Sequence, residues 1–544
     1  MRKKTLSALL CTVAAMAVLT GCGGDKKETV AAPAEGNTTA AVTEAAKTEA
    51  ETTAAVQTEA GGEKNLVMPS ASCVANLNPL LEGYKEAAML NPIYDPLYVI
   101  DVNETRYYLA DSYEVSEDGM QITVKLKEGL KWHDGEAITA DDMIFTMDVC
   151  SDTNNGAGGT NIVILNDQPV KYEKVDDLTV KVTLPMASAS YADLLGSLTL
   201  IPEHVFEGNP SVVSAGEANM KGIGSGPYKV TEFKQDEYLL LEKYEDYYMG
   251  APSIDKVTFR IISDLSAQEV ALMNGEVNFM ELANAPAVAK YEADPNFTVV
   301  KYPEGRVNYL AVNKFCETVQ DPKVVEAVFA ALNRDEIIAG AYGDGMAESA
   351  NSIFSNVNTF YDPSVEGYTQ DVEKAKQLVK ETGLDSRTLT LYFNSERVYM
   401  KESAQIIQQQ LKNVGINLEV IPLESAGFFE KVFGTDGDYE FYLNGYGAVG
   451  DPDQVVAGMY DGTWGVNLAV SDEVSQLWKD ARTVYTPEER AAIYKQIQIQ
   501  TRDELTCYPI AYPNYVFVTT SNIKGADTIK RTPVFEDYTK LTME

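Results

Sequence analysis

Residues 109–149 constrain the fold of this chain more than any other stretch of its sequence. Apolar residues alternate with polar ones from 121 to 127, which predicts a half-buried strand because successive side chains of a strand point to opposite faces. A Glu-Asp-Gly sequence at 117–119 predicts a tight turn before that strand. Thr139 is expected to cap a helix with Asp142 as its reciprocal partner. Local patterning therefore predicts a hairpin followed by a helix.

The order of motifs within residues 109–149 resembles family 5 of the solute-binding proteins of ABC importers, a group of di- and oligopeptide receptors and nickel receptors. The motifs are Leu-Ala-x-Ser-Tyr-Glu-Val-Ser-x-Asp-Gly, Glu-Gly-Leu-Lys-Trp-His-Asp-Gly and Ile-Thr-Ala-Asp-Asp. Ile-Pro-x-His-x-Phe at 201–206 and Gly-Ser-Gly-Pro-Tyr at 224–228 continue the resemblance. It implies an α/β protein with a two-lobed periplasmic-binding-protein-like fold of the cluster C type and an extra inserted subdomain.

The same resemblance implies how the chain is divided. The expected boundaries are 1–21 for a signal peptide, 22–64 for a lipidated disordered tether, 65–92, 213–312 and 501–544 for a discontinuous lobe I, 93–212 for the inserted subdomain and 313–500 for lobe II. In this family the chain passes between the lobes along two strands, which are expected here at 307–315 and 507–519. The inserted subdomain is called the insert below.

The N-terminus has the pattern of an exported lipoprotein. Basic residues 2–4 precede an apolar run at 6–19, which is too short to span a bilayer but long enough for a signal-peptide core. The sequence Leu-Thr-Gly-Cys ending at Cys22 resembles a bacterial lipobox, and the alternative is a cysteine beside a plain secretory cleavage site. Residues 23–64 are poor in aromatics and rich in Ala, Thr and Glu, which predicts a flexible tether. We therefore expect an extracytoplasmic protein anchored to the cell membrane by lipid on Cys22.

The chain is strongly acidic, with 44 Lys and Arg against 81 Asp and Glu and a formal net charge of −37. This charge disfavours nucleic acid and anionic membrane surfaces as partners. Beyond Cys22, the widely spaced Cys73, Cys150, Cys316 and Cys507 form no C-x-x-C pattern, so neither a zinc site nor a redox motif is indicated. Disulfides stay open, and buried free thiols are the simpler interpretation.

Helix and strand patterns alternate through the second half of the chain. Expected strands lie at 178–184, 228–233, 252–261, 389–393 and 416–421, and expected helices at 267–275, 324–332, 374–382, 403–414 and 487–505. A helix followed by a strand, repeated, predicts an α/β lobe.

The sequence lacks the residue sets that enzymes require. His133 and His204 are the only histidines, and neither accompanies a Gly-x-Ser-x-Gly motif. They lie in separate motifs, which argues against a shared metal site, and His133 and Trp132 are expected to be packing and turn residues. We predict no enzyme activity, no cofactor and no metal, with an exported hydrolase as the remote alternative.

Residues 439–467 resemble the segment in which the family has an aromatic residue and then an Asp-Pro dipeptide. Tyr446 stands at the aromatic position, and Asp451 begins the dipeptide. Peptide receptors of the family have an aspartate four residues before that proline, which pairs with the α-amino group of the ligand. This chain has Ala448 there, and it has Trp464 where the nickel receptors supply a histidine.

Other residues of the same segment are candidate substitutes for these anchors. Asp451 and Asp453 are expected to accept an ammonium group, and Tyr446 or Trp464 to stack on a sugar or a cation. The alternative for Asp451 is a helix-entry turn, and the alternative for the two aromatic residues is a core position.

Tyr94, Asn313 and Arg397 complete the predicted ligand-binding set, because they stand where the family's lobes face the cleft. The predicted function is a lipid-anchored receptor that captures a di- or oligopeptide, or a similar small nutrient, between its lobes and delivers it to ABC permease subunits. An oligosaccharide or glycoside receptor of the same family is the alternative. A nickel-metallophore receptor has less support because Trp464 replaces the histidine. The resemblance also implies a monomer.

Overall fold

The computed structural model describes residues 63–81, 87–100, 104–447, 450–460, 468, 470–529 and 537–544. The predicted signal peptide, Cys22 and the predicted tether up to residue 62 lie outside the described residues, as do Ala448 and Trp464. Contacts with lobe I begin at the predicted end of the tether, where the Lys64 amide donates to the Asp255 carboxylate at 2.9 Å. Within the described ranges, no helix has both the length and the apolar composition needed to cross a membrane.

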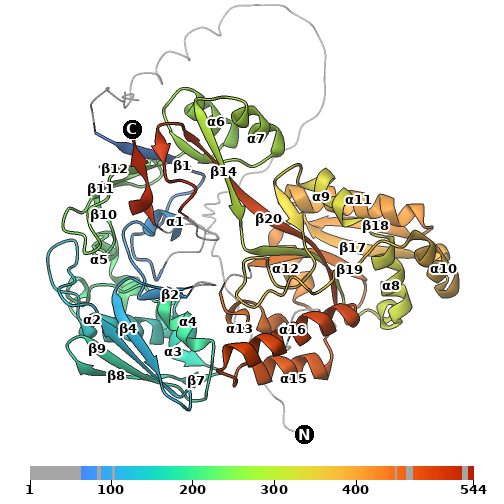
Figure 1. Cartoon of the computed structure of the whole chain (residues 1–544), viewed down its shortest axis with the longest axis horizontal. Coiled ribbons are helices and arrows are strands. Elements are labelled where there is room, and N and C mark those ends of the chain that lie inside the picture. The colour runs from blue at the N-terminus through green and yellow to red at the C-terminus, as the bar shows by residue number, and fades with distance from the viewer. Residues whose placement is uncertain are drawn as a thin grey trace, which may run out of the picture. The chain divides into compact units, whose positions relative to one another are not determined.

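Lobe I contains a four-stranded sheet that joins the first strand of the fold to three strands from later in the chain (Figure 1). The order is β1 (Asn65–Ser70), β12 (Lys256–Ile261), β11 (Tyr238–Lys243) and β10 (Tyr228–Lys234), with β1 parallel to β12 and the other pairs antiparallel. Leu66, Leu239 and Val257 are fully buried, as their alternation with more exposed neighbours requires. The strands expected at 228–233 and 252–261 are therefore confirmed, the second beginning at Lys256.

The hairpin and helix predicted from residues 109–149 are present in the insert. The elements are β4 (Ala110–Val115), β5 (Gln121–Leu126) and α2 (Ala140–Ser151), and β5 continues through β9 (Thr179–Thr183) to β8 (Lys171–Asp176) in one antiparallel sheet. Gly119 has φ +64° in the hairpin turn, a conformation that glycine adopts without strain. Thr139 caps α2, and the Asp142 carboxylate accepts from the Thr139 amide at 2.9 Å, so the predicted reciprocal cap is confirmed.

The turn after this hairpin is held against the Gly-rich turn before β10. His133 Nε2 donates to the Gly226 carbonyl at 2.9 Å, and its Nδ1 accepts from the Gly224 amide at 3.2 Å. Burial lowers the pKa of His133 to about 4, so the ring is neutral near pH 7. Trp132 is fully buried. Both side chains therefore have the packing and turn roles expected from the sequence.

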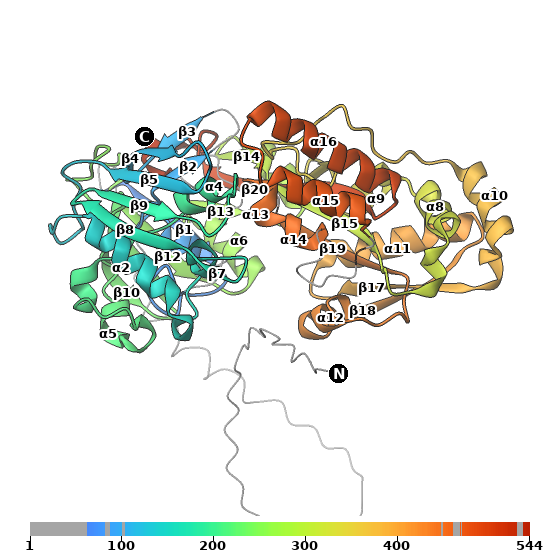
Figure 2. The ribbon, with the colours of Figure 1, turned by 90° about the horizontal axis from the view of Figure 1, so that it is seen from below.

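Lobe II is a sheet with helices on both faces (Figure 1). Its strands run in the order β15 (Arg306–Val312), β19 (Phe441–Gly447), β17 (Thr388–Asn394) and β18 (Asn417–Leu423). Leu310 and Leu443 face a core shared with α8 (Pro322–Ala331), α10 (Val372–Thr382) and α11 (Val398–Asn413). Tyr309 and Tyr442 face the opposite core, shared with α12 (Ser425–Val432), α15 (Asp472–Ala481) and α16 (Pro487–Asp503). The predicted α/β lobe is confirmed, and α15 and α16 lie together in Figure 2.

One long strand, β20 (Cys507–Thr520), is shared by the two lobes. Near its C-terminal end it pairs with β13 (Phe279–Glu281) and β14 (Phe297–Pro303), and near its N-terminal end with β15 and β16 (Ala347–Ser349). The strand expected at 507–519 is confirmed as β20, and the strand expected at 307–315 is present as β15 but ends at Val312. The chain enters β15 directly from β14 through residues 304 and 305, so two adjacent segments connect the lobes at this place.

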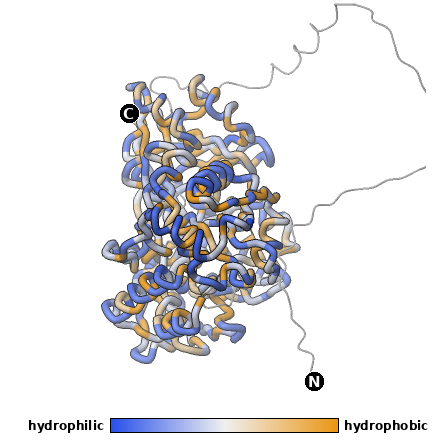
Figure 3. Tube along the Cα trace, turned by 90° about the vertical axis from the view of Figure 1, so that its right-hand side faces the viewer, coloured by the Kyte–Doolittle hydropathy of each residue, from blue (hydrophilic) through white to orange (hydrophobic). Residues whose placement is uncertain are grey.

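The remaining elements are short or peripheral. They are α1 (Ala87–Leu90), β2 (Tyr98–Ile100), β3 (Thr105–Tyr107), α3 (Thr160–Val163), β6 (Ile164–Leu165), β7 (Gln168–Pro169), α4 (Tyr191–Gly196), α5 (Gly216–Asn219), α6 (Leu265–Met273), α7 (Ala285–Glu292), α9 (Arg334–Ala341), α13 (Pro452–Val455), α14 (Ala457–Tyr460), β21 (Ile523–Lys524) and β22 (Thr542–Met543). Hydrophobic and hydrophilic stretches are interspersed along the described chain (Figure 3). Cys150, Cys316 and Cys507 are buried free thiols and Cys73 is half-buried, so the thiol interpretation is confirmed for the first three.

Candidate ligand-binding site

Tyr446 lies on β19 within lobe II. The residue is 9% exposed, its hydroxyl donates to the Ile353 carbonyl at 2.6 Å, and this hydroxyl lies 3.2 Å from that of Tyr460. Its ring centroid is 5.1 Å from the ring of Tyr309 on the neighbouring β15. The hydroxyl is therefore hydrogen-bonded inside lobe II, and the ring is part of the core of that lobe.

Asp451 is the N-cap of α13 and one half of a buried ion pair. Its carboxylate accepts from the Asp453 amide at 3.0 Å, which confirms the helix-entry turn considered from the sequence. Arg490 Nη2 donates to the same oxygen at 2.8 Å, Arg490 Nη1 donates to the other oxygen, and the Tyr494 hydroxyl adds a contact at 3.3 Å. The guanidinium thus already occupies the position in which a ligand ammonium would bind Asp451.

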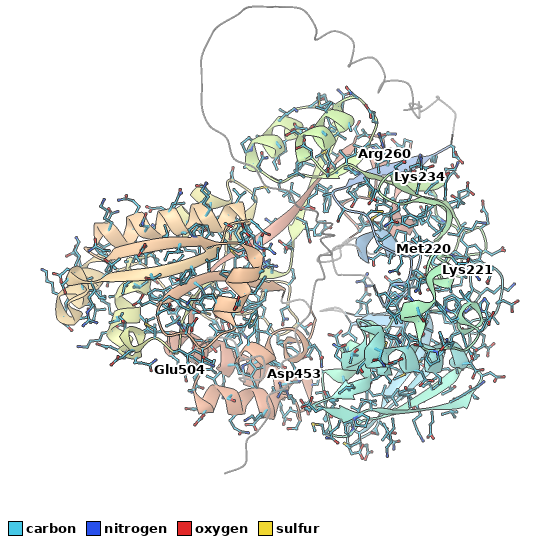
Figure 4. The ribbon with its side chains drawn as sticks, turned by 180° about the vertical axis from the view of Figure 1, so that it is seen from behind. Met220, Lys221, Lys234, Arg260, Asp453 and Glu504 are labelled. Atoms are coloured by element: carbon cyan, nitrogen blue, oxygen red, sulfur yellow. The ribbon has the colours of Figure 1, made fainter. Side chains whose placement is uncertain are left out.

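Asp453 lies where lobe II meets the insert (Figure 4). Its carboxylate accepts from Ser190 Oγ of the insert at 2.8 Å and from Arg482 Nε of lobe II at 2.5 Å. Burial raises the pKa of Asp453, and the Arg482 guanidinium opposes that rise. Asp453 is therefore part of a contact between two parts of the fold.

Tyr94 and Asn313 are engaged in the cores of their own lobes. The Tyr94 hydroxyl donates to the Leu77 carbonyl at 2.8 Å. Asn313 is fully buried, and its side-chain amide donates to the carbonyls of Asp436 and Tyr439 at 2.8 and 2.9 Å. These bonds fix the backbone turns around the two side chains.

Arg397 differs from the other predicted residues because its guanidinium has no hydrogen bond or ion pair with any described residue. It is half-buried at the N-terminal end of α11. Arg397 interacts electrostatically with Glu304, which lies in the connection between β14 and β15. Burial raises the pKa of Glu304, and the positive charges of Arg306 and Arg397 partly oppose that rise. Arg397 therefore faces the place where the lobes are connected.

Four charged residues meet at this connection, and we call them the hinge cluster: Glu281, Glu304, Arg306 and Arg397. Arg306 Nη2 donates to the Gly445 carbonyl at 2.7 Å. Glu281 is exposed at its surface, but the surrounding protein removes much of the water around its carboxyl, and this desolvation, followed by repulsion from Glu304, raises the pKa of Glu281 to about 7. Among the described residues, neither glutamate side chain has a hydrogen-bond or ion-pair partner. The cluster thus offers both a cation and carboxylates to a bound molecule.

The structure brings only some of the predicted residues together. Arg397 belongs to the hinge cluster. Arg306 of the same cluster hydrogen-bonds to the carbonyl of Gly445, the residue before Tyr446, so Tyr446 follows directly after a contact of this cluster. Asp451 and Asp453 belong instead to the contact with the insert, while Tyr94 and Asn313 lie in separate cores.

Sequence reasoning missed the other three members of the hinge cluster. Glu304 and Arg306 belong to the sequence Pro-Glu-Gly-Arg at 303–306, a charged turn between two apolar strands. Charged turns are common at protein surfaces, and nothing in the local pattern separates this one from the others.

Two α/β lobes that share a strand, with the charged hinge cluster at their connection, have the architecture of a two-lobed binding protein, a class that holds its ligand between the lobes. Among the residues that the structure describes, no group of three or more His, Cys, Asp or Glu side chains is placed to hold a metal ion.

The chain belongs to the bacterial extracellular solute-binding proteins, family 5, whose middle-region model matches residues 104–467. It is 27% identical over 499 residues to the dipeptide-binding protein of Escherichia coli (strain K12), covering 85% of this chain and 92% of that one. The resemblance seen in the sequence motifs is thus confirmed. Members of this family are substrate-binding receptors that act outside the cytoplasm.

Solved structures of related proteins share the fold. The ABC transporter substrate-binding protein CtaP of Listeria monocytogenes has a TM-score of 0.82 at 33% identity, covering 88% of this chain and 99% of that chain. The oligopeptide-binding protein AppA of Bacillus subtilis, in complex with a nonapeptide, has a TM-score of 0.70 at 26% identity, with coverage of 89% and 99%. The predicted two-lobed α/β fold is therefore confirmed.

Proposed function

We propose that this chain is the extracytoplasmic substrate-binding component of an ABC importer and that it captures a di- or oligopeptide between its lobes. The observation that carries the proposal is the Arg397 guanidinium of the hinge cluster, which has no hydrogen bond or ion pair with any described residue, in a chain similar to peptide-binding proteins of ABC transporters. A planar guanidinium pairs with a carboxylate through two parallel hydrogen bonds. Arg397 accordingly binds a carboxylate of the peptide.

Position 448 is alanine in this chain, so the amino group of the peptide needs an acceptor at another position. Glu281 and Glu304 supply carboxylates that have no partner among the described residues and lie at the same connection between the lobes. An ammonium group would relieve the repulsion between them. Asp451 is the weaker acceptor, because Arg490 already neutralises it.

The rest of the functional proposal follows from the sequence. Lipid on Cys22 anchors the protein to the cell membrane, and permease subunits of the importer receive the peptide from a monomeric receptor. The predicted boundaries of the lobes and the insert belong to the same proposal. The relatives that bind peptides favour this class over an oligosaccharide, a nickel complex or a hydrolytic substrate.

Calorimetry with the full chain and a ladder of alanine peptides tests the proposal. Free peptides are compared with N-acetylated and C-amidated forms, and the wild type with Arg397→Gln. Loss of a charge-assisted hydrogen bond costs about 1.5–3 kcal/mol, so Arg397→Gln should weaken binding about 10- to 100-fold and remove the preference for a free C-terminus. Arg387→Gln, an exposed arginine of the same lobe, is the matched control.

The outcomes separate the parts of the proposal. A ladder without saturable binding rejects the peptide class. Binding that ignores C-terminal amidation and is unchanged in Arg397→Gln rejects the carboxylate role of Arg397. Glu304→Gln should weaken binding of the free peptide as N-acetylation does. We expect this variant to bind free and N-acetylated peptides with equal affinity.

A further inference from the structure

The insert and lobe II are joined by a small set of hydrogen bonds between residues far apart in the sequence. Asp193 Oδ2 on α4 accepts from the Asp451 amide at 2.8 Å. Ser190 Oγ donates to Asp453 at 2.8 Å and accepts from Gln454 Nε2 at 2.6 Å. These bonds place α4 beside α13, as Figures 1 and 2 both show. We call this set the closure contact.

Two glycines permit this close approach. Gly450 has φ +81°, and a Cβ added there would lie 2.9 Å from Asp193 Oδ2, closer than a carbon atom normally approaches. Gly119 has φ +64°, and a Cβ there would overlap the ring of Tyr485, whose hydroxyl donates to the Gly119 carbonyl at 3.3 Å. The insert and lobe II therefore match each other in shape at two separate points.

Lobe II presents its half of the contact on a rigid base. Arg482 Nε holds Asp453 at 2.5 Å, and the Arg482 carbonyl also accepts from the Ala189 amide of the insert at 2.9 Å. Arg490 holds Asp451 from behind, with Nη2 at 2.8 Å from Oδ1. Because each aspartate is fixed by an arginine of its own lobe, its position does not depend on the insert.

We propose that Ser190 and Asp193 are positioning residues that set the population of the closed form, in which the insert rests on lobe II, and thereby the affinity for ligand. A receptor that binds between two lobes has an apparent affinity proportional to its closed population. The closure contact joins the insert to lobe II and includes no residue of the hinge cluster, so we expect the same direction of effect for every ligand that binds at that cluster. This inference rests on the part of the proposed function that places the ligand between the lobes, and it does not require that ligand to be a peptide.

The contact also makes closure sensitive to pH. The charged and titratable groups around Asp193 are Asp451, Asp453, Arg482 and Arg490 of lobe II and Tyr98, Tyr113 and Tyr191 of the insert. In the contact, burial and then repulsion from Asp451 raise the pKa of Asp193 to about 6. Opening that returns the carboxyl to water restores its ordinary pKa of about 3.9.

The closed form therefore binds this proton more tightly and is favoured as the pH falls. With these two pKa values, the ratio of closed to open molecules rises about tenfold between pH 7.5 and pH 5. Asp453 shifts the equilibrium in the same direction, because its pKa is also raised in the contact.

Energy transfer between fluorophores placed by unnatural amino acids at Glu128 of the insert and Asp385 of lobe II, both exposed, measures closure in the full chain without ligand. Asp193→Ala removes the acceptor and should lower the closed-to-open ratio about tenfold at pH 5. Asp193→Asn keeps an acceptor oxygen but removes the titration. Glu114→Gln, an exposed carboxylate of the insert, is the control and should retain the wild-type profile.

The double variant Asp193→Asn with Asp453→Asn should show no response between pH 5 and 7.5. Ser190→Ala and Gly450→Ala should each lower the closed fraction, with far-UV circular dichroism confirming that the variants are folded. Equal closed fractions in Asp193→Ala and the wild type would overturn the proposal. A double variant that keeps the wild-type pH response would overturn the titration that we assign to the contact.

Discussion

Replacement of Asp451 by alanine tests the interpretation of this residue as a structural anion of lobe II. Asp451 and Arg490 are 8% and 5% exposed, and two guanidinium nitrogens of Arg490 bond to the carboxylate. Removal of one partner leaves a buried charge without compensation, which costs about 3–5 kcal/mol, and the lost helix cap adds about 1 kcal/mol. Neighbouring effects overlap, so we expect a loss of about 4 kcal/mol in the free energy of unfolding.

For a lobe of this size, each kcal/mol shifts the melting temperature by about 2–4 °C, so the expected decrease is about 8–16 °C. Differential scanning calorimetry of the full chain measures it, with Asp385→Ala, an exposed aspartate of lobe II, as the control. Asp451→Leu combined with Arg490→Met should recover most of the loss, because apolar pairs replace buried ion pairs at little cost. A loss below about 1 kcal/mol in Asp451→Ala would refute the argument.

Three further predictions follow from burial and capping. Thr139→Ala should destabilise the chain by about 1 kcal/mol in urea denaturation and Thr139→Ser by much less, whereas equal losses would contradict the cap. Burial raises the pKa of Cys150 and Cys507 to about 12, so both thiols should resist a disulfide reagent at pH 8 until guanidinium unfolds the chain. Rapid labelling of either thiol in the folded protein would contradict this. Burial also raises the pKa of Asp95 to about 7, so its contribution to stability falls as the pH rises from about 4 past 7, and Asp95→Asn should flatten that decline in melting temperature.

The elements that sequence patterns predicted are those specified by nearby residues. The hairpin at β4 and β5 and the cap at Thr139 depend on periodicity and on residues three positions apart. β20 is expected because the family resemblance places a second crossing strand at 507–519, where the sequence has a long apolar and aromatic run. β13 and β16 contain only three residues each and become strands through pairing with β20, more than 150 positions away, so local pattern did not indicate them.

The candidate site was less predictable for the same reason. Arg490 determines whether Asp451 is free to bind a ligand, yet the two residues are 39 positions apart and nothing local links them. Glu281 and Glu304 become a pair only when β13 and the β14–β15 connection meet. Glu281 and Glu304 are two of 81 acidic residues in this sequence, so nothing distinguishes them until the fold brings them together.

The shared strand has a consequence for export. β13 and β14 of lobe I both pair with β20, and Tyr538 and Met543 near the C-terminus are buried in the lobe I core. A chain that emerges from its N-terminus first therefore cannot complete lobe I until β20 and residues 538–543 are available. Until then β13 and β14 offer unpaired edges to other chains. The interval between the emergence of residue 303 and that of β20 is consequently when this protein depends most on factors that suppress aggregation.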